Sequence, residues 1–180
     1  AVNHLASSGI TIYASKGTLE ETGMLNHHRS RVMEPLKKYG IGINSIGGFK
    51  VIGFPIVHDT KEPFGFIIDH PESGIIVFLT DTVYSKFRFK DAVHYIVEAN
   101  YDEDIIDNLG GDKSFLRDRI LQSHMSIQTL EKMLLANDLS KTRTITLTHL
   151  SDRNSNQTTA KQKIENAFGK QTYIADAGLS

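Results

Sequence analysis

The stretch Val77-Phe78-Leu79-Thr80-Asp81-Thr82 joins an apolar run to a carboxylate at the point where a loop begins. Two other stretches repeat this arrangement with an imidazole, Ile56-Val57-His58-Asp59 and Ile145-Thr146-Leu147-Thr148-His149. Apolar runs rich in β-branched residues are typical of strands. Side chains at strand ends project from a rigid sheet, which is how a preorganised metal site is built. We therefore predict one shared metal site formed by His58, Asp81 and His149.

A simpler interpretation of each residue stays open. A polar side chain after an apolar strand also marks the place where burial stops. Three such residues together, two of them histidines, favour the metal site. The sequence has no cysteine, so any metal must be held by imidazole and carboxylate groups, the ligands that zinc or manganese takes when thiolates are absent.

Outward from these stretches, β-type runs alternate with helical patterns. The predicted strands are 10–14, 50–58, 64–68, 75–80, 95–98, 143–148 and 173–175. The predicted helices are 103–109, 114–121, 127–137 and 158–168, with a short one starting at Thr18 in a capping box with Glu21. Hairpin spacing early and helices between strands later favour α/β architecture with two packed mixed sheets and helices outside. No linker or repeat interrupts residues 1–180, so we expect a single domain.

Composition limits the functional classes. Hydrophobic residues make up 39% and charged residues 23%, which is ordinary for a globular protein. The longest apolar run, Gly74–Leu79, is too short to cross a bilayer, so no membrane partner is expected. The net charge of −1 gives no global basic field, so a nucleic-acid partner needs a local basic groove or a metal. The lack of cysteine fits a reducing compartment, and we expect a cytoplasmic protein.

The same three stretches resemble, in order, the third, fourth and fifth metal motifs of metallo-β-lactamase-fold hydrolases of the nuclease type. Pro63-Phe64-Gly65-Phe66 extends the first of them. Val97–Asp102 and Ser123–Ser126 are similar to segments of the YycJ-like exonuclease branch and, more distantly, of tRNase Z. The resemblance covers nearly the whole chain. It implies an αββα sandwich.

The resemblance also implies roles for single residues. His58 would ligate one of two divalent ions and His149 the other, with Asp81 between them. The ions, zinc or manganese, would activate a bridging hydroxide. His124 would protonate the leaving group and Glu98 would orient His124. Simpler alternatives are that His124 starts a helix and that Glu98 is a plain strand-end carboxylate.

One part of the family pattern is missing. The signature His-x-His-x-Asp-His, which supplies two ligands to each ion in relatives, does not occur in this sequence. In relatives it precedes the helix that Ala1–Leu5 resembles, so we expect an N-terminally incomplete domain that lacks its first strands. Without the signature each ion has two ligands, one of them shared, fewer than a zinc site needs. The 180 residues alone are therefore expected to be inactive.

The expected function of the complete protein is that of a metal-dependent phosphodiesterase, namely an exonuclease for which DNA is favoured over RNA. An RNA-processing nuclease, a hydrolase of small esters or amides, and a metal-free binding module derived from the fold are the alternatives. The cluster His27-His28-Arg29 is either a phosphate-contacting patch or an exposed polar turn. No basic or aromatic recognition motif stands out, so base-specific reading is not expected. The oligomeric state stays open.

Overall fold

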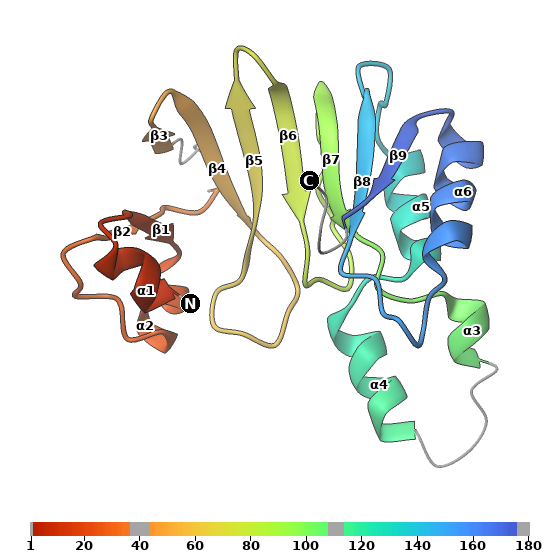
Figure 1. Ribbon diagram of the computed structural model, residues 1–180, viewed down its shortest axis with the longest axis horizontal. Coiled ribbons are helices and arrows are strands. Elements are labelled where there is room, and N and C mark those ends of the chain that lie inside the picture. Colours follow the sequence, from red (N-terminus) through yellow and green to blue (C-terminus); the bar gives the residue numbers. More distant parts are fainter. Residues whose placement is uncertain (1, 37–43, 108–113, 176–180) are drawn as a thin grey trace.

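The computed structural model describes residues 2–36, 44–107 and 114–175 of the chain (Figure 1). Its helices are α1 (Val2–Ser7), α2 (Lys16–Glu21), α3 (Glu103–Asp107), α4 (Ser114–Ser123), α5 (Ile127–Leu135) and α6 (Gln157–Phe168). Its strands are β1 (Ile12–Ala14), β2 (Ser30–Val32), β3 (Asn44–Ile46), β4 (Phe49–Pro55), β5 (Phe64–His70), β6 (Gly74–Leu79), β7 (Ala92–Glu98), β8 (Thr144–Thr148) and β9 (Gln171–Ile174).

Seven strands form one mixed sheet in the order β3-β4-β5-β6-β7-β8-β9. The pairs from β3 to β6 are antiparallel, and those from β6 to β9 are parallel. Since β4 and β6 both run against β5, β4 points the same way as β6, β7 and β8 (Figure 1). The carboxyl ends of these four strands therefore lie along one edge of the sheet.

One face of the sheet carries the main core. Helices α5 and α6 cover it beside β7, β8 and β9 (Figure 1). The core includes Phe54, Val77, Leu79, Tyr95, Val97, Leu130, Leu134, Ile145, Leu147 and Ile164. On the opposite face, Phe66, Phe78 and Ile96 lie beside one another in register and are only partly buried.

A smaller unit lies at the N-terminal end, where β1 and β2 pair in parallel and Ala6, Leu19 and Met24 form a second core. Helix α2 begins at Lys16, earlier than the predicted start at Thr18, because the Ser15 hydroxyl accepts a hydrogen bond from the Thr18 amide at 3.1 Å and takes the N-cap position. Glu21 instead accepts a hydrogen bond from the Lys61 amide. The capping-box interpretation of Thr18 and Glu21 was wrong.

The predicted α/β class with a mixed sheet is confirmed, but the described residues form one large mixed sheet and a separate pair of short parallel strands, where two packed mixed sheets were expected. Each predicted strand and helix has a counterpart, with shifted ends. The clearest shift is in β4, which ends at Pro55 and not at His58. Strands β2 and β3 were not predicted, and of the predicted helix 103–109 the last two residues lie outside the described residues. In the described part of the chain no helix has the length and apolar character needed to span a membrane.

The core contains one hydroxyl that yields a stability prediction. Tyr95 is fully buried, and no described residue hydrogen-bonds its Oη atom. Burial raises the pKa of Tyr95 to about 12. Because an unsatisfied buried hydroxyl costs about 1–3 kcal/mol, Tyr95→Phe is expected to keep or raise the free energy of unfolding in urea. Thr142→Val is the control and should lower it, since the buried Thr142 hydroxyl donates a hydrogen bond to the Ala92 carbonyl at 2.9 Å. A loss of stability in Tyr95→Phe would contradict this prediction.

Candidate metal centre

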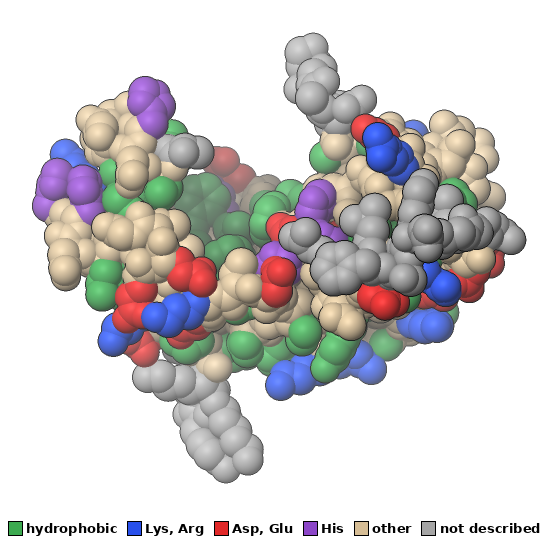
Figure 2. Space-filling view, turned by 90° about the horizontal axis from the view of Figure 1, so that it is seen from below, with side chains coloured by type: hydrophobic (Ala, Val, Ile, Leu, Met, Phe, Trp, Pro, Cys, Tyr) green, Lys and Arg blue, Asp and Glu red, His purple; other side chains and the backbone are tan. Residues whose placement is uncertain are grey.

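Three acidic or imidazole side chains come from neighbouring parallel strands at the carboxyl edge of the sheet. Glu98 is the last residue of β7, His149 directly follows β8, and Asp81 follows β6 by two residues. The register aligns Leu79 with Val97 and Glu98 with Thr148, so the three positions are adjacent across the strands. Figure 2, which looks onto this edge, shows histidine and acidic side chains together at the middle of the molecule.

Glu98 is the centre of this cluster. Its Oε1 atom lies 2.6 Å from Nδ1 of His124 and 3.1 Å from Nδ1 of His149. The same His149 nitrogen lies 3.2 Å from Oδ1 of Asp81. One ligand atom from each of these four residues lies within 4.8 Å of the others. Predicted ligands Asp81 and His149 are thus in contact, and predicted catalytic residues Glu98 and His124 share their cluster.

His124 reaches the edge from the loop that follows α4. The next residues are tied to the segment after β7, because the Asn100 amide donates to the Met125 carbonyl at 2.9 Å and the Ile127 amide donates to the Tyr101 carbonyl at 2.8 Å. Ser126 caps α5 by accepting a hydrogen bond from the Thr129 amide. His124 therefore precedes a helix cap, as the simpler alternative expected, and also contacts Glu98.

The backbone is strained at two of the cluster residues. Asp81 has φ of 53° and His149 has φ of 55°, a left-handed conformation that costs residues with a side chain roughly 1–2 kcal/mol. The Asn100 amide group donates to the His149 carbonyl at 2.8 Å and holds this conformation. Strain of this kind persists where the surroundings impose it, and it gathers at functional sites. Sequence reasoning gave Asn100 no role, although it lies two residues after Glu98 in the Val97–Asp102 segment.

The environment of Glu98 favours its protonated form. The side chain is fully buried, and this burial raises the pKa of Glu98 to about 7. The negative charge of Asp81 acts in the same direction, while the Thr82 amide, which donates to Oε2 at 2.9 Å, and the charge of His149 lower the pKa. Near neutral pH the carboxyl is therefore poised between its two charge states.

This shift predicts a pH dependence of stability for the metal-free protein. The Glu98 carboxyl has a pKa of about 7 in the folded chain against an ordinary value of 4.5, so between these two pH values it binds more protons when folded. Its contribution to the free energy of unfolding should therefore fall as pH rises from about 4.5 to about 7. Melting temperatures measured in chelator should fall over this range more in the wild type than in Glu98→Gln. Parallel curves for the two proteins would refute the assigned pKa.

His58 lies beside the cluster, not within it. Its ring centroid is 6.1 Å from that of His124, and its Nε2 atom is 3.3 Å from Oδ1 of Asp59. Nδ1 of His58 is buried and finds no hydrogen-bond partner among the described residues. The loop is fixed next to Asp81, because the Val57 amide donates to Oγ1 of Thr82 at 3.1 Å.

The donor set fits a divalent ion. Two carboxylates and two imidazoles, with the His58 imidazole beside them, are the nitrogen and oxygen ligands that suit zinc or manganese. Ligand atoms around one zinc ion lie at most about 4.4 Å apart, given bonds of 2.0–2.2 Å. The spacing of up to 4.8 Å therefore requires only small side-chain shifts. The buried Nδ1 atom of His58, which has no hydrogen-bond partner among the described residues, also fits a metal ligand. A second ion stays a prediction.

This chain is similar to known proteins in its three-dimensional structure and not in its amino-acid sequence. No protein-family model matches the sequence, and no curated protein matches it significantly. Among solved structures, the metallo-β-lactamase fold protein YhfI from Bacillus subtilis matches 94% of this chain with a TM-score of 0.64 and 16% identity. The chain therefore has the metallo-β-lactamase fold. A diphosphatase of the PhnP family matches 93% of the chain with a TM-score of 0.54 and 15% identity.

These two structures confirm the predicted fold. The chain spans 62% of the length of the first structure and 55% of the second. At these identities the likeness concerns the fold alone. The roles of His58, Asp81, Glu98, His124 and His149, like the nuclease activity, therefore stay predictions that rest on the geometry described above.

Proposed function

We propose that the protein is a metal-dependent phosphodiesterase that acts on nucleic acid, with DNA favoured over RNA. The observation that carries this proposal is the buried Glu98 carboxyl, which contacts the imidazoles of His124 and His149 at the edge where Asp81 also lies. The resemblance of the Ser123–Ser126 segment to the YycJ-like exonuclease branch supports the choice of substrate.

Asp81 and His149, together with His58, are the residues that would hold divalent ions. Such ions would supply Lewis-acid stabilisation of the charge that develops on a phosphate. Zinc or manganese suits these ligands. The chain itself would fix the ligands in advance, since Asp81 and His149 extend from a rigid sheet edge and each has a fixed left-handed backbone.

His124 would donate a proton to the leaving oxygen. Nδ1 of His124 lies 2.6 Å from the Glu98 carboxyl, so in the proposed role Nδ1 would carry a proton toward Glu98 and transfer to a leaving oxygen would use Nε2. Ionised Glu98 favours the protonated ring and sets its orientation, the role of the acidic partner in a general-acid pair. The Thr82 amide holds Oε2 of Glu98 and so keeps Oε1 directed at the two imidazoles.

The test uses the natural full-length product, stripped of metal and then supplied with zinc or manganese. Hydrolysis is measured on end-labelled single-stranded DNA, on RNA of the same sequence and on bis(p-nitrophenyl) phosphate, with a β-lactam as the non-phosphate control. The proposal expects cleavage of the phosphodiesters that stops when chelator is added.

Three results would count against it. Cleavage of the β-lactam without cleavage of any phosphodiester would favour the alternative of a small ester or amide hydrolase. Faster cleavage of RNA would favour RNA processing. A protein that binds no zinc or manganese by elemental analysis and cleaves nothing would favour the metal-free binding module.

A further inference from the structure

The connection between β6 and β7 is an extended segment with an alternating surface. These strands are parallel, so residues 82–91 must run from the carboxyl edge of the sheet back to the opposite edge. Phe87 and Phe89 lie 5.2 and 5.3 Å from the Phe54 ring and pack on the core face. Every second residue before, between and after them is exposed, namely Tyr84, Lys86, Arg88 and Lys90.

The three cations of this segment have no acidic partner among the residues that the structure describes. None of those residues forms an ion pair with Lys86, Arg88 or Lys90, whereas nearby Asp91 is paired with Lys141 at 2.9 Å. Successive exposed residues of an extended chain are about 6.6 Å apart, so the charges form a regular row. In a chain with a net charge of −1, this row is a local basic surface.

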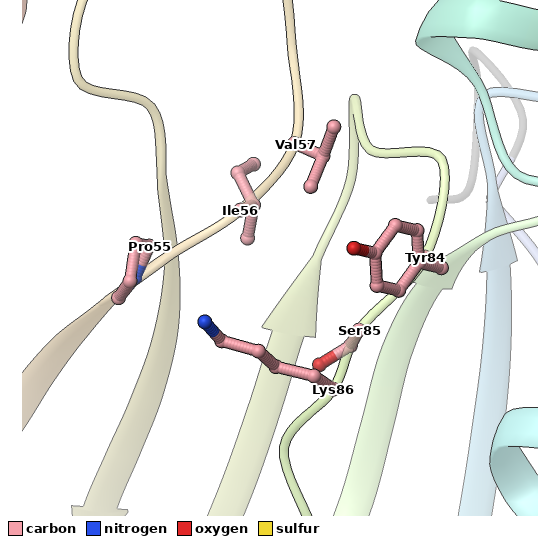
Figure 3. Close-up of a pocket in the computed structure, with 6 residues that line it drawn as sticks. All are labelled: Pro55, Ile56, Val57, Tyr84, Ser85 and Lys86. Carbon is pink, nitrogen blue, oxygen red and sulfur yellow. The ribbon is translucent and has the colours of Figure 1, made fainter.

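A pocket lies at the end of the row that is next to the candidate metal centre. It has a volume of about 90 Å³ and is lined by Pro55, Ile56, Val57, Tyr84, Ser85 and Lys86. Figure 3 shows the Lys86 amino group and the Tyr84 hydroxyl directed toward the Pro55–Val57 segment. The Lys86 ammonium also lies 5.7 Å from the centre of the Phe87 ring, a contact that restrains its position. The pocket thus offers a cation and a hydroxyl to one phosphate-sized anion.

Backbone contacts tie this pocket to the cluster. The Val83 amide donates to the Val57 carbonyl at 3.3 Å, and Oγ1 of Thr82 donates to the Tyr84 carbonyl at 3.0 Å. Val57 adjoins His58, and Tyr84 follows Asp81 by three residues, a span of at most about 11 Å. A phosphate in the pocket would therefore lie close to one held at the metal centre.

We propose that Tyr84, Lys86, Arg88 and Lys90, here named the basic row, bind the backbone of a single-stranded polynucleotide that extends from the metal centre. This inference rests on the proposed function and adds where the substrate lies. Lys86 and the Tyr84 hydroxyl take the phosphate nearest the centre, and Arg88 and Lys90 take the following ones. The half-exposed Tyr84 ring offers a face on which a base stacks. The contacts are sequence-independent, because they involve phosphates and a stacking surface.

The test is binding of a fluorescent single-stranded 20-nucleotide DNA to metal-free full-length protein, followed by fluorescence anisotropy over a salt series. The triple variant K86A/R88A/K90A is expected to bind at least about tenfold more weakly. The slope of log affinity against log salt should fall by about 2, since each phosphate contact to a single strand contributes about 0.7. The matched control K161A/K163A/K170A removes three lysines of α6 and the loop after it, and should keep wild-type affinity and slope.

The outcomes separate the two proposals. An unchanged salt slope in K86A/R88A/K90A, with a normal thermal melt, would overturn the proposed binding role of the basic row. An equal loss of DNA affinity in the control variant would do the same. Equal or tighter binding of a duplex that depends on the same three residues would overturn the single-strand assignment. Failure of the wild type to hydrolyse bis(p-nitrophenyl) phosphate with zinc or manganese would overturn the proposed function, whatever the binding data show.

Discussion

His149→Ala is expected to lower hydrolysis of single-stranded DNA by about 10³-fold or more, which corresponds to roughly 4 kcal/mol of lost transition-state stabilisation. The imidazole contacts both Asp81 and Glu98, so its removal takes a donor from the centre of the cluster. Bound metal should fall together with activity. Initial rates and elemental analysis of the natural full-length protein measure both quantities.

Two further variants make this result specific. Because His149 has a left-handed backbone, alanine adds strain there, whereas asparagine tolerates that conformation. His149→Asn should therefore lose activity with less loss of stability. His4→Ala, which removes an exposed histidine of α1, should keep full activity and metal content. A His149→Ala protein that retains metal and cleaves DNA normally would remove this residue from the centre.

His124→Ala is expected to reduce kcat on DNA by about 10²–10⁴-fold, the usual contribution of a general acid. The loss on bis(p-nitrophenyl) phosphate should be much smaller, because p-nitrophenolate leaves without receiving a proton. Glu98→Gln should give the same pattern with a smaller loss, since the amide no longer stabilises a protonated His124. Comparison of kcat for both substrates in each variant measures this dependence on the leaving group.

A purely structural role for His124 predicts a different pattern. Equal losses on the two substrates, or a large drop in melting temperature, would indicate that the ring only fills space beside Glu98. The short contact of 2.6 Å between Nδ1 and the carboxylate is the feature that the catalytic role requires.

The approach of Asp81 to His149 could be predicted from the sequence, because both follow apolar runs that were recognised as strands. In the structure β6 and β8 flank β7 and all three strands are parallel, so their carboxyl ends lie on one edge of the sheet. A contact between Glu98 and His124 was expected from the family resemblance, but the second contact of Glu98, with His149, was not predicted. The cluster also depends on the loop after α4, which brings His124 to Glu98 and His149 at the strand ends, and a hydrophobic pattern does not predict the path of that loop. The position of His58, three residues beyond the end of β4, likewise depends on hydrogen bonds to Thr82 and Val83.

The basic row was not predicted from the sequence, for a related reason. An alternation with a period of two residues is typical of a strand, yet residues 82–90 pair with no strand and cross a sheet face instead. Only the packing of Phe87 and Phe89 on Phe54 shows which residues point outward. Strands β2 and β3 were missed because each has only three residues and gains its pairing from tertiary context.

The positive φ angles at positions 81 and 149 have a consequence for directed evolution. Glycine suits such angles better than aspartate or histidine, so a library screened only for heat resistance would enrich glycine at both positions. The selected variants would be more stable and would lack two of the proposed metal ligands, Asp81 and His149. Thermal stability and catalytic activity would therefore have to be screened together, because stability favours glycine at these positions whereas the proposed activity requires aspartate and histidine.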